Sequence, residues 1–524
     1  MPSSDHLTMK PLARLVALSS LAFSPFITHA EVKLPPVISD HLVLQRATTV
    51  PIWGTASPGE KVAVSLAGQK RATVADAKGQ WRVLLDPMPV AERLSLIVQG
   101  ENTLTIEDVL VGEVWLGSGQ SNMAGPVRTF KGNDTGLQRI HAAAPYPRIR
   151  LIKQGGTGWQ IATPEIVDGY SALLFAFGAR LQAELGVPVG LMLGAVGGTP
   201  SGFWLTEEMY RRDSACQAQA KEFAATYDFA AATKAYERQI AAWKMGEAKA
   251  KQEGRKVGRA PTPPAPAGES PGRIGHLYEA HVRPYVPYAI RGVLWDQGES
   301  GTAITGVDQF NVMGALIRGW RQDWGQDIPF LYIQKPSGGG TAWDLENPTT
   351  KNANPFSPLP AQVPGTKDGL AREVHLRIWQ HPRTALVTST DLGGNTHPVN
   401  KSGYADRAVR VALGFVYDRR LEISGPLYAS HTIEGNKVRV RFTHVGGGLS
   451  ARHRDQLQGF MIAGADREFH WADALIAADS VLVSNPHVTA PAAVRYAWSG
   501  AAPWANLFNQ DGLPAQTFRT DTWK

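Results

Sequence analysis

Apolar and polar residues alternate along residues 31–108, and Gly, Pro and Asn separate the alternating runs. The runs include VPIWGTASPGEKVAVSLAG, ATVADAKGQWRVLLDPM and SLIVQGENTLTIEDVLVG. Successive side chains of a strand point to opposite faces of a sheet, so this alternation predicts strands with one buried face. Several short strands joined by close turns are typical of antiparallel sandwiches. We therefore predict an N-terminal β-sandwich domain over residues 31–108.

From residue 109 the pattern changes to continuous apolar runs that alternate with helical stretches. The runs VLVGEVWLG, PVGLMLGAV, IRGVLWDQG and IPFLYIQ predict strands that are buried on both faces, and SALLFAFGARLQAEL predicts a helix. Strands of this kind alternate with helices in parallel sheets, because the helices cover both faces of the sheet. We therefore predict an α/β domain over residues 109–420.

Three further segments differ from this α/β pattern. An Ala-, Glu- and Lys-rich run and the connector GRAPTPPAPAGESPG predict an insertion of one or two long helices around residues 205–273. Residues 337–370 form an irregular stretch that is too long for a passive turn, and it could act as a lid. Alternating runs return in a β-rich segment over residues 421–524, which could form one sandwich with the N-terminal strands or a second one.

The first 30 residues have the layout of a secretory signal. Lys10 and Arg14 form a positive region, LVALSSLAF is apolar, and the small residue Ala30 ends the segment. The apolar part is too short to cross a bilayer, and no later run approaches the length of a membrane helix. We expect residues 1–30 to be a signal peptide, and the rest of the chain to be periplasmic or secreted, without a membrane span.

Composition and cysteine count argue against several kinds of cofactor and partner. Of the 524 residues, 43% are hydrophobic and 19% are charged, and the formal net charge of +7 includes no block of basic residues that would favour nucleic acid. Cys216 is the only cysteine, so the chain can form neither an intrachain disulfide nor a thiolate metal cluster. His276 and His281 are five residues apart, which separates them on a helix. We expect no cofactor, no metal and no nucleic-acid partner.

The stretch VWLGSGQSNMAGP leaves an apolar strand through two glycines and places Ser121 on the turn. A serine on such a turn exposes its hydroxyl, and nearby backbone N–H groups can stabilise an oxyanion, which suggests a nucleophile. Ser121 could equally cap the helix that follows. A nucleophile needs a base, and His397 is the candidate, because it lies in a loop after an apolar strand and precedes Pro398, which disfavours helical geometry.

Other polar residues and glycines also follow apolar strands. Gln297 and Glu299 end the strand in GVLWDQGES, at the sheet edge where α/β proteins form their sites. Gly197 and Gly198 end the strand in LMLGAVGG, and consecutive glycines let backbone N–H groups approach a ligand. The Gly-Lys-Ser or Gly-Lys-Thr of a phosphate loop does not follow them, which excludes that kind of nucleotide site.

Four motifs together resemble the sialate O-acetylesterase-like branch of the SGNH hydrolases. They are GSGQSNM, GGTP followed by a tryptophan, LYEAHVRPYVPYAIRGVLWDQGES, and DLG followed by HPVNKSGYADR. The opening VISDHLVLQR and the closing NLFNQDGLPAQTFRTD are similar to the same branch, so the resemblance covers nearly the whole chain after residue 30. It implies an SGNH-type three-layer α/β/α core with a parallel sheet, flanked by jelly-roll-like β-sandwich segments.

The resemblance assigns roles to the residues that match the family's motifs. It implies that Ser121 is the nucleophile and His397 the base. The oxyanion donors would be the backbone N–H groups of Ser121 and of Gly198, or of Gly197 if the loop is shifted. This branch has Gln-Gly-Glu where related enzymes carry an asparagine, so the side chain of Gln297 is our third candidate donor.

In the family pattern, Asp-x-x-His, the acid that orients the histidine stands three positions before it. Here that position, 394, is a glycine. Asp391 is the first candidate and Glu299 the second, unless His397 works with the serine alone. We therefore expect Asp391→Asn to reduce turnover far more than Glu299→Gln. For contacts with substrate, the candidates are Asn122 and two tryptophans in or near loops, Trp204 and Trp343.

These features predict a serine carbohydrate O-acetylesterase, a carboxylic ester hydrolase that acts on an acetylated oligosaccharide or polysaccharide. Within the branch, the chain most resembles exported bacterial enzymes that deacetylate hemicellulose, notably xyloglucan oligosaccharides, and sialic acid is the alternative substrate. Two other functions stay open. One is a glycoside hydrolase with two carboxylates, in which Asp296 or Glu299 works with Asp391. The other is a glycan-binding protein without catalysis.

Overall fold

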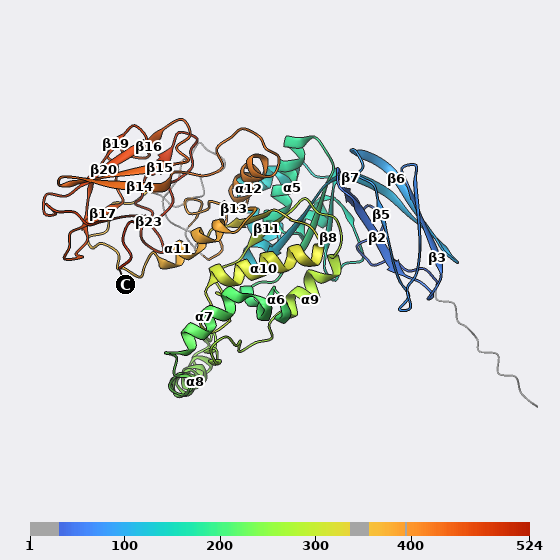
Figure 1. Ribbon diagram of the computed structural model, residues 1–524, viewed down its shortest axis with the longest axis horizontal. Helices are drawn as coiled ribbons and strands as arrows, with labels where there is room; N and C mark the ends of the chain where they lie inside the picture. The colour runs from blue at the N-terminus through green and yellow to red at the C-terminus, as the bar shows by residue number, and fades with distance from the viewer. Residues whose placement is uncertain (1–30, 336–355, 394–395, 524) are drawn as a thin grey trace, which may run out of the picture.

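The computed structural model describes residues 31–335, 356–393 and 396–523. Figure 1 shows three regions in a row: N-terminal β-strands at one end, a mixed α/β region in the middle, and C-terminal β-strands at the other end. The expected signal peptide at residues 1–30, Trp343 and much of the 337–370 stretch lie outside the described residues. None of the helices in the described ranges combines the length and the apolar character that a membrane crossing requires.

A mostly parallel sheet forms the middle region. Its strands lie in the order β13-β12-β11-β7-β10-β8-β9, and each neighbouring pair is parallel except β8 and β9 at the edge. The mixed α/β class predicted from the pattern is therefore confirmed. Strands β11, β12 and β13 are buried at every position, as continuous apolar runs predict. The strands are β7 (Thr103–Gly119), β8 (Tyr146–Lys153), β9 (Gln160–Ala162), β10 (Val189–Ala195), β11 (Gly292–Asp296), β12 (Phe330–Ile333) and β13 (Thr384–Val387).

Helices cover both faces of this sheet. Helices α5 (Ala172–Leu185) and α12 (Lys401–Phe415) share one apolar cluster with the sheet, and α10 (Gln309–Trp324) shares another. Trp115 belongs to the first cluster and Leu116 to the second, because neighbouring side chains of β7 point to opposite faces. The shorter helices near the sheet are α1 (Ser121–Ala124), α2 (Val127–Phe130), α3 (Thr135–Ala142), α4 (Pro164–Asp168), α9 (His276–His281) and α11 (Leu370–Arg377).

Strand β7 joins the N-terminal sheets to the central sheet. Its first six residues alternate between exposed and half-buried and lie beside β6, whereas from Val109 every residue is buried, and from Glu113 the strand pairs with β10. The change of pattern at residue 109 thus lies inside one strand. Strands β2 and β5 form a separate antiparallel pair. The N-terminal strands are β1 (Val43–Gln45), β2 (Val50–Thr55), β3 (Lys61–Leu66), β4 (Gln69–Val74), β5 (Gln80–Leu85) and β6 (Ala91–Gln99).

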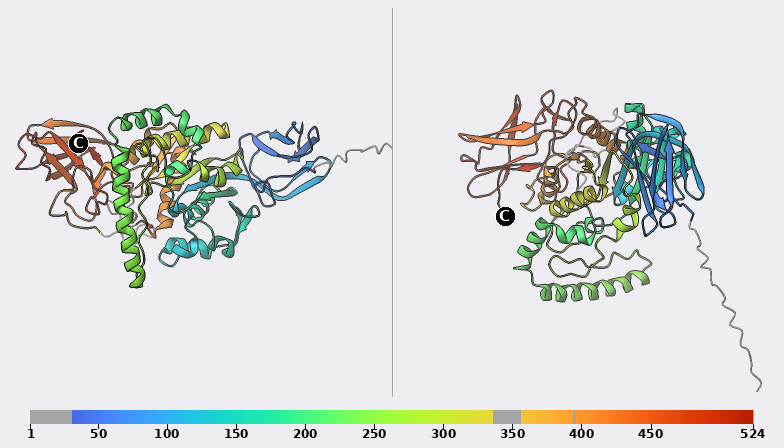
Figure 2. Two further views of the ribbon diagram at one scale, coloured as in Figure 1. Left: turned by 90° about the horizontal axis from the view of Figure 1, so that it is seen from below. Right: turned by 45° about the vertical axis from the view of Figure 1, so that its right-hand side comes forward.

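The insertion forms three helices within the described residues 205–273, where one or two were predicted. They are α6 (Glu207–Arg212), α7 (Ser214–Ala224) and α8 (Phe229–Gln252). The side chains of Asp213 and Asp228 accept hydrogen bonds from the first turns of α7 and α8, so each helix starts at its own cap. Helix α8 extends away from the rest of the molecule, as Figure 2 shows, and Ala250 is its one buried residue.

The C-terminal strands form sheets of their own. In the described part of the chain, two four-stranded antiparallel sheets, β14-β15-β20-β19 and β18-β17-β21-β23, share one apolar cluster. This cluster is separate from the core of the N-terminal strands, so the two β regions are not one sandwich. The strands are β14 (Leu427–Glu434), β15 (Lys437–Thr443), β16 (Leu449–Ala451), β17 (Phe460–Ala463), β18 (His470–Trp471), β19 (Asp473–Ala477), β20 (Ser480–Ser484), β21 (Ala493–Tyr496), β22 (Leu507–Asn509) and β23 (Phe518–Arg519).

Candidate active site

The turn after β7 places Ser121 at the edge where the parallel strands end. Gly119 has a φ of 123°, and a Cβ on it would lie 2.2 Å from the backbone oxygen of Asp296 on β11. A Cβ on Gly117 would lie 2.6 Å from the side chain of Leu174 on α5. Both glycines of the motif are therefore required by close packing around the strand end. Ser121 follows them as the first residue of α1.

Ser121 lies beside His397. The distance between Ser121 Oγ and His397 Nε2 is 2.8 Å, although the two residues are 276 positions apart in the sequence. When the imidazole carries its proton on Nδ1, Nε2 accepts the hydrogen bond from the serine hydroxyl, which is the geometry of a general base and its nucleophile. His397 is exposed and Ser121 is half-buried, so solvent and ligands can reach the pair.

Asn122 connects the serine turn to the histidine loop. Its Nδ2 donates hydrogen bonds to Glu299 Oε1 at 2.9 Å and to the backbone oxygen of Thr396 at 3.0 Å. Its Oδ1 accepts a hydrogen bond from Lys401 Nζ at 2.6 Å. Asn122 is fully buried, so its position differs from the one expected for a substrate contact. Its three hydrogen bonds instead fix the residue after Ser121 relative to the residue before His397.

Buried charged side chains also hold the Ser121 turn in place. Glu299 Oε2 accepts a hydrogen bond from Gln120 Nε2 at 2.7 Å, and Lys335 Nζ lies 2.9 Å from Glu299 Oε1 and 2.8 Å from Asp296 Oδ1. Burial raises the pKa of Asp296 against the attraction of Lys335. Burial acts in the same direction on Glu299, but Lys335 and the hydrogen bonds to the carboxylate, including that of Asn122, together outweigh it and lower the pKa of Glu299. Burial lowers the pKa of Lys401 to about 7.

Neither carboxylate that we considered as the orienting acid hydrogen-bonds to His397 among the described residues. Asp391 is buried, and its Oδ1 and Oδ2 accept hydrogen bonds from the Arg407 guanidinium at 3.2 and 2.7 Å. The oxygens of Glu299 are bound by the side-chain amides of the serine turn and by Lys335. Asp391 therefore fixes the start of the histidine loop to α12, and Glu299 supports the serine turn.

The glycine loop after β10 approaches the serine through Gly197. A Cβ on Gly197 would lie 3.4 Å from Ser121 Cβ, whereas a Cβ on Gly198, whose φ is 72°, would meet only Arg259 at 3.4 Å. Gly197, our second choice from the sequence, is thus the glycine that packs against the nucleophile turn.

Gln297 has a different role in the structure from the one expected. Its Nε2 donates to the backbone oxygens of Gly301 at 3.0 Å and Thr199 at 3.3 Å, and its Oε1 accepts from Gln309 at 2.9 Å. The amide protons are therefore used within the protein, and Gln297 braces the loop that follows Gly198. An oxyanion would have to displace one of these hydrogen bonds to reach it.

Trp204 is a core residue and does not face a ligand. Its side chain is fully buried, its Nε1 donates to Thr199 Oγ1 at 3.0 Å, and its ring packs edge-on against Trp295 with centroids 6.1 Å apart. The position just after a glycine loop suggested exposure, but the neighbouring short helical turn at Ser201–Phe203 directs the ring inward. Trp343 lies outside the described residues.

Sequence reasoning missed the two lysines of the site. Lys335 and Lys401 are at most 1% exposed, and each reaches the Ser121 turn through a carboxylate or an amide. A lysine at the end of a continuous apolar strand, as in FLYIQK, was the one available signal for Lys335. Within the described ranges, no three His, Cys, Asp or Glu side chains gather so as to hold a metal ion.

Curated proteins match this chain over most of their length. The chain is 25% identical over 513 residues to the sialate O-acetylesterase of Pongo abelii and 25% identical over 514 residues to that of Homo sapiens, and each alignment covers 88% of this chain and 86% of the relative. The resemblance to the sialate O-acetylesterases is confirmed. No protein-family model matches the chain.

The fold also matches a solved structure. A carbohydrate acetylesterase from Xanthomonas citri is 29% identical and superposes with a TM-score of 0.73, over 94% of this chain and 100% of that protein. Since so little of the described chain falls outside this match, the β regions on both sides of the central sheet belong to the shared architecture.

Proposed function

We propose that the chain is a serine carbohydrate O-acetylesterase, which hydrolyses acetyl esters on sugar hydroxyls. The observation that carries the proposal is the 2.8 Å contact between Ser121 Oγ and His397 Nε2 at the end of the parallel sheet. The names of the similar proteins, sialate O-acetylesterase and carbohydrate acetylesterase, support the same reaction class, a carboxylic ester hydrolase.

The reaction proceeds in two halves. His397 Nε2 takes the hydroxyl proton of Ser121 while Oγ attacks the acetyl carbonyl, and the tetrahedral intermediate collapses when the histidine returns that proton to the departing sugar oxygen. The products of this half are a free sugar hydroxyl and an acetyl-serine. Water, deprotonated by His397, then attacks the acetyl-serine and releases acetate, and the proton returns to Ser121 Oγ.

Backbone N–H groups stabilise the oxyanion in both halves. Ser121 is the first residue of α1, and its N–H donates to no protein group among the described residues, which leaves it for a ligand. The N–H of Gly197 is the second donor, since this residue packs directly against the serine. Loss of one such donor costs roughly 3 to 4 kcal/mol of transition-state stabilisation in serine hydrolases.

We assign this core to the SGNH type. Helices lie on both faces of a parallel sheet, and the Ser121, Gly197 and His397 motifs follow β7, β10 and β13 at one edge of that sheet, in the order that the family resemblance implies. The N- and C-terminal sheets are the flanking β-sandwich segments.

We place the enzyme outside the cytoplasm, in the periplasm or secreted, because residues 1–30 have the layout of a signal peptide. Its substrate is an acetylated oligosaccharide or polysaccharide, with hemicellulose such as xyloglucan oligosaccharides favoured over sialic acid. The sequence resemblance to exported hemicellulose esterases supports the first choice, and the names of the vertebrate relatives support the second.

The contacts of the carboxylates argue against a two-carboxylate glycoside hydrolase. Asp296 and Glu299 share Lys335, and Asp391 is paired with Arg407. A glycosidase needs one carboxyl group to protonate the leaving oxygen and a second to act on the opposite face of the sugar ring, and cations occupy all three candidates.

The test is acetate release from a chromogenic acetyl ester and from acetylated xyloglucan, xylan, pectin and sialic acid. We expect the wild type to release acetate and Ser121→Ala to lose at least about 1,000-fold in kcat, since removing a nucleophile leaves only binding and oxyanion stabilisation. Ser57→Ala, in the turn between β2 and β3 of the N-terminal region, is the matched control and should retain full activity. Release of reducing sugar without acetate, or equal rates for Ser121→Ala and wild type, would contradict the proposal.

A further inference from the structure

Two adjoining cavities lie between the outward face of strands β2 and β5 and the central domain. The first has a volume of about 610 Å³ and the second of about 580 Å³. Arg82 and Pro287 line both of them, so the two cavities adjoin each other. Each volume is in the range of ligand-binding clefts, and such clefts occur preferentially between domains. We call this feature the β2–β5 groove.

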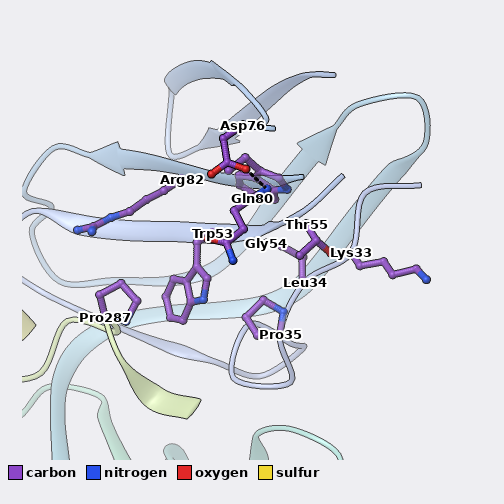
Figure 3. Close-up of a pocket in the computed structure, with 11 residues that line it drawn as sticks. Lys33, Leu34, Pro35, Trp53, Gly54, Thr55, Asp76, Gln80, Arg82 and Pro287 are labelled. Carbon is purple, nitrogen blue, oxygen red and sulfur yellow. Dashed lines mark hydrogen bonds between the residues drawn. The ribbon is translucent and has the colours of Figure 1, made fainter. Parts of the chain in front are cut away.

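The strand register places an aromatic ring among polar side chains in this groove. Trp53 of β2 pairs with Arg82 of β5, and Thr55 pairs with Gln80, so these four side chains share one face of the two-stranded sheet. Figure 3 shows the Trp53 ring between the rings of Pro287 and Pro35, with the Gln80 side chain extending toward it. The ring is half-buried and packs edge-on against Tyr288, with centroids 6.3 Å apart, which fixes its orientation.

The polar groups of the first cavity are available to a ligand. Among the described residues, the side chains of Lys33, Gln80 and Arg82 form no hydrogen bond or ion pair with the protein, and all three are exposed. Asp76 Oδ1 accepts hydrogen bonds from the backbone N–H groups of Lys78 and Gln80, which holds the loop before β5 in place. The second cavity adds the hydroxyls of Thr48 and Thr49 and the amides of Gln322 and Gln326.

The groove is separate from the candidate active site. Pro287 precedes β11, whereas Asp296 at the other end of β11 contacts the Ser121 turn through Gly119. The groove therefore lies at the edge where the parallel strands begin, and the serine lies at the edge where they end. A sugar unit that is bound in the groove therefore cannot place its own acetyl ester at Ser121.

We infer that the β2–β5 groove is a second carbohydrate-binding site, which takes a chain of several sugar rings. The flat face of an indole stacks on the C–H face of a sugar ring, and unpaired amide, guanidinium and ammonium groups hydrogen-bond to hydroxyls. A groove of two adjoining cavities suits an extended chain better than a single sugar. The identification of the bound polysaccharide as a hemicellulose rests on the proposed function, whereas the presence of a glycan site does not.

The test uses the full chain carrying Ser121→Ala, so that binding is measured without turnover. Its retardation is followed in native gels that contain xyloglucan, xylan, pectin or no polysaccharide. We expect retardation by at least one polysaccharide, and a loss of about 10-fold in affinity in Trp53→Ala, the equivalent of about 1.4 kcal/mol. Trp243→Ala, which truncates a half-exposed tryptophan on α8, should bind as before.

A second variant tests the groove without removing the half-buried Trp53 ring, whose loss could also affect stability. Gln80→Ala combined with Arg82→Ala changes only exposed side chains, and it should weaken binding while the melting temperature stays unchanged. No retardation by any polysaccharide, equal binding by all variants, or binding of a proline-rich peptide in place of the glycans would overturn the inference.

Turnover separates this inference from the proposed function. In the wild-type background, Trp53→Ala should leave kcat/KM for a small chromogenic acetyl ester unchanged and raise KM for the acetylated polymer. Polymer binding without acetate release would contradict the esterase proposal but not the inference that the groove binds glycans. Acetate release with the same KM for the polymer in wild type and Trp53→Ala would contradict the groove inference but not the esterase proposal.

Discussion

The hydrogen-bond partners of each candidate carboxylate in the site show what that carboxylate holds in place. Glu299 accepts hydrogen bonds from the side chains of Gln120 and Asn122, which flank Ser121 directly, whereas Asp391 is bound by Arg407 on α12. The sequence favoured Asp391 because it precedes His397 in the same loop. In the structure Glu299 contacts the nucleophile turn, whereas neither carboxylate hydrogen-bonds to His397 among the described residues, so the identity of the orienting acid stays a prediction.

We therefore predict different effects for the two isosteric substitutions. Glu299→Gln removes the charge that Gln120 and Asn122 donate to and should lower kcat about 10- to 100-fold, since hydrogen bonds to a charged group contribute about 1.5 to 3 kcal/mol. Asp391→Asn leaves Arg407 buried beside a neutral group and should chiefly lower the melting temperature. Steady-state kinetics on a chromogenic acetyl ester and thermal unfolding measure both effects. A larger loss of kcat in Asp391→Asn would restore it as the orienting acid.

At the scale of elements, the site depends on the relative position of a turn and a loop. The turn after β7 carries Ser121, and the loop between β13 and α12 carries His397. Asn122 joins them through its hydrogen bond to the backbone oxygen of Thr396, and Lys401, the first residue of α12, holds Asn122 by its side-chain oxygen. The separation of nucleophile and base is thus set by a buried side-chain amide that hydrogen-bonds to neither reactive side chain.

The prediction that follows concerns Lys401→Met, which keeps the length of the side chain but removes its N–H donors. Asn122 then loses one of its three hydrogen bonds, and we expect kcat to fall about 10-fold or more with KM unchanged, because small misplacement of reacting groups reduces rate steeply. Lys234→Met, on the exposed surface of α8, is the control. A loss confined to melting temperature, with kcat preserved, would show that Lys401 acts on stability alone.

At the scale of the molecule, one buried histidine makes stability depend on pH. His375 on α11 is 5% exposed, its Nδ1 has no hydrogen-bond partner among the described residues, and burial together with the nearby Lys335 lowers its pKa to about 4. In the unfolded chain a histidine titrates near pH 6.5. Between these two values the unfolded state binds more protons than the folded state, so stability falls as the pH falls.

We predict that His375 costs the folded protein about 2 kcal/mol at pH 5 relative to pH 7.5, the difference expected when a pKa near 6.5 moves to about 4. Urea unfolding at the two pH values measures it. His375→Gln removes the titration and should flatten this part of the profile, whereas His487→Gln, on the exposed surface, should not. Equal pH dependence in His375→Gln and wild type would contradict the assignment.

The sequence by itself determined the local features of this protein. Alternating and continuous apolar runs located the strands, because burial on one or two faces leaves a direct periodic pattern. The glycines before Ser121 and the proline after His397 located the two reactive groups, because both constrain the backbone at their own position. These features concern residues that are neighbours in the chain.

Only the tertiary structure decided what the other polar side chains do. Gln297, Asn122 and Trp204 are close in sequence to the motifs of the site, yet the side chain of each turns into the protein and finds partners there. Lys335 and Lys401 lie 214 and 280 positions after Ser121 and still approach its turn. Outside regular elements, side-chain direction and distant partners follow from how the elements pack, and spacing along the chain does not specify them.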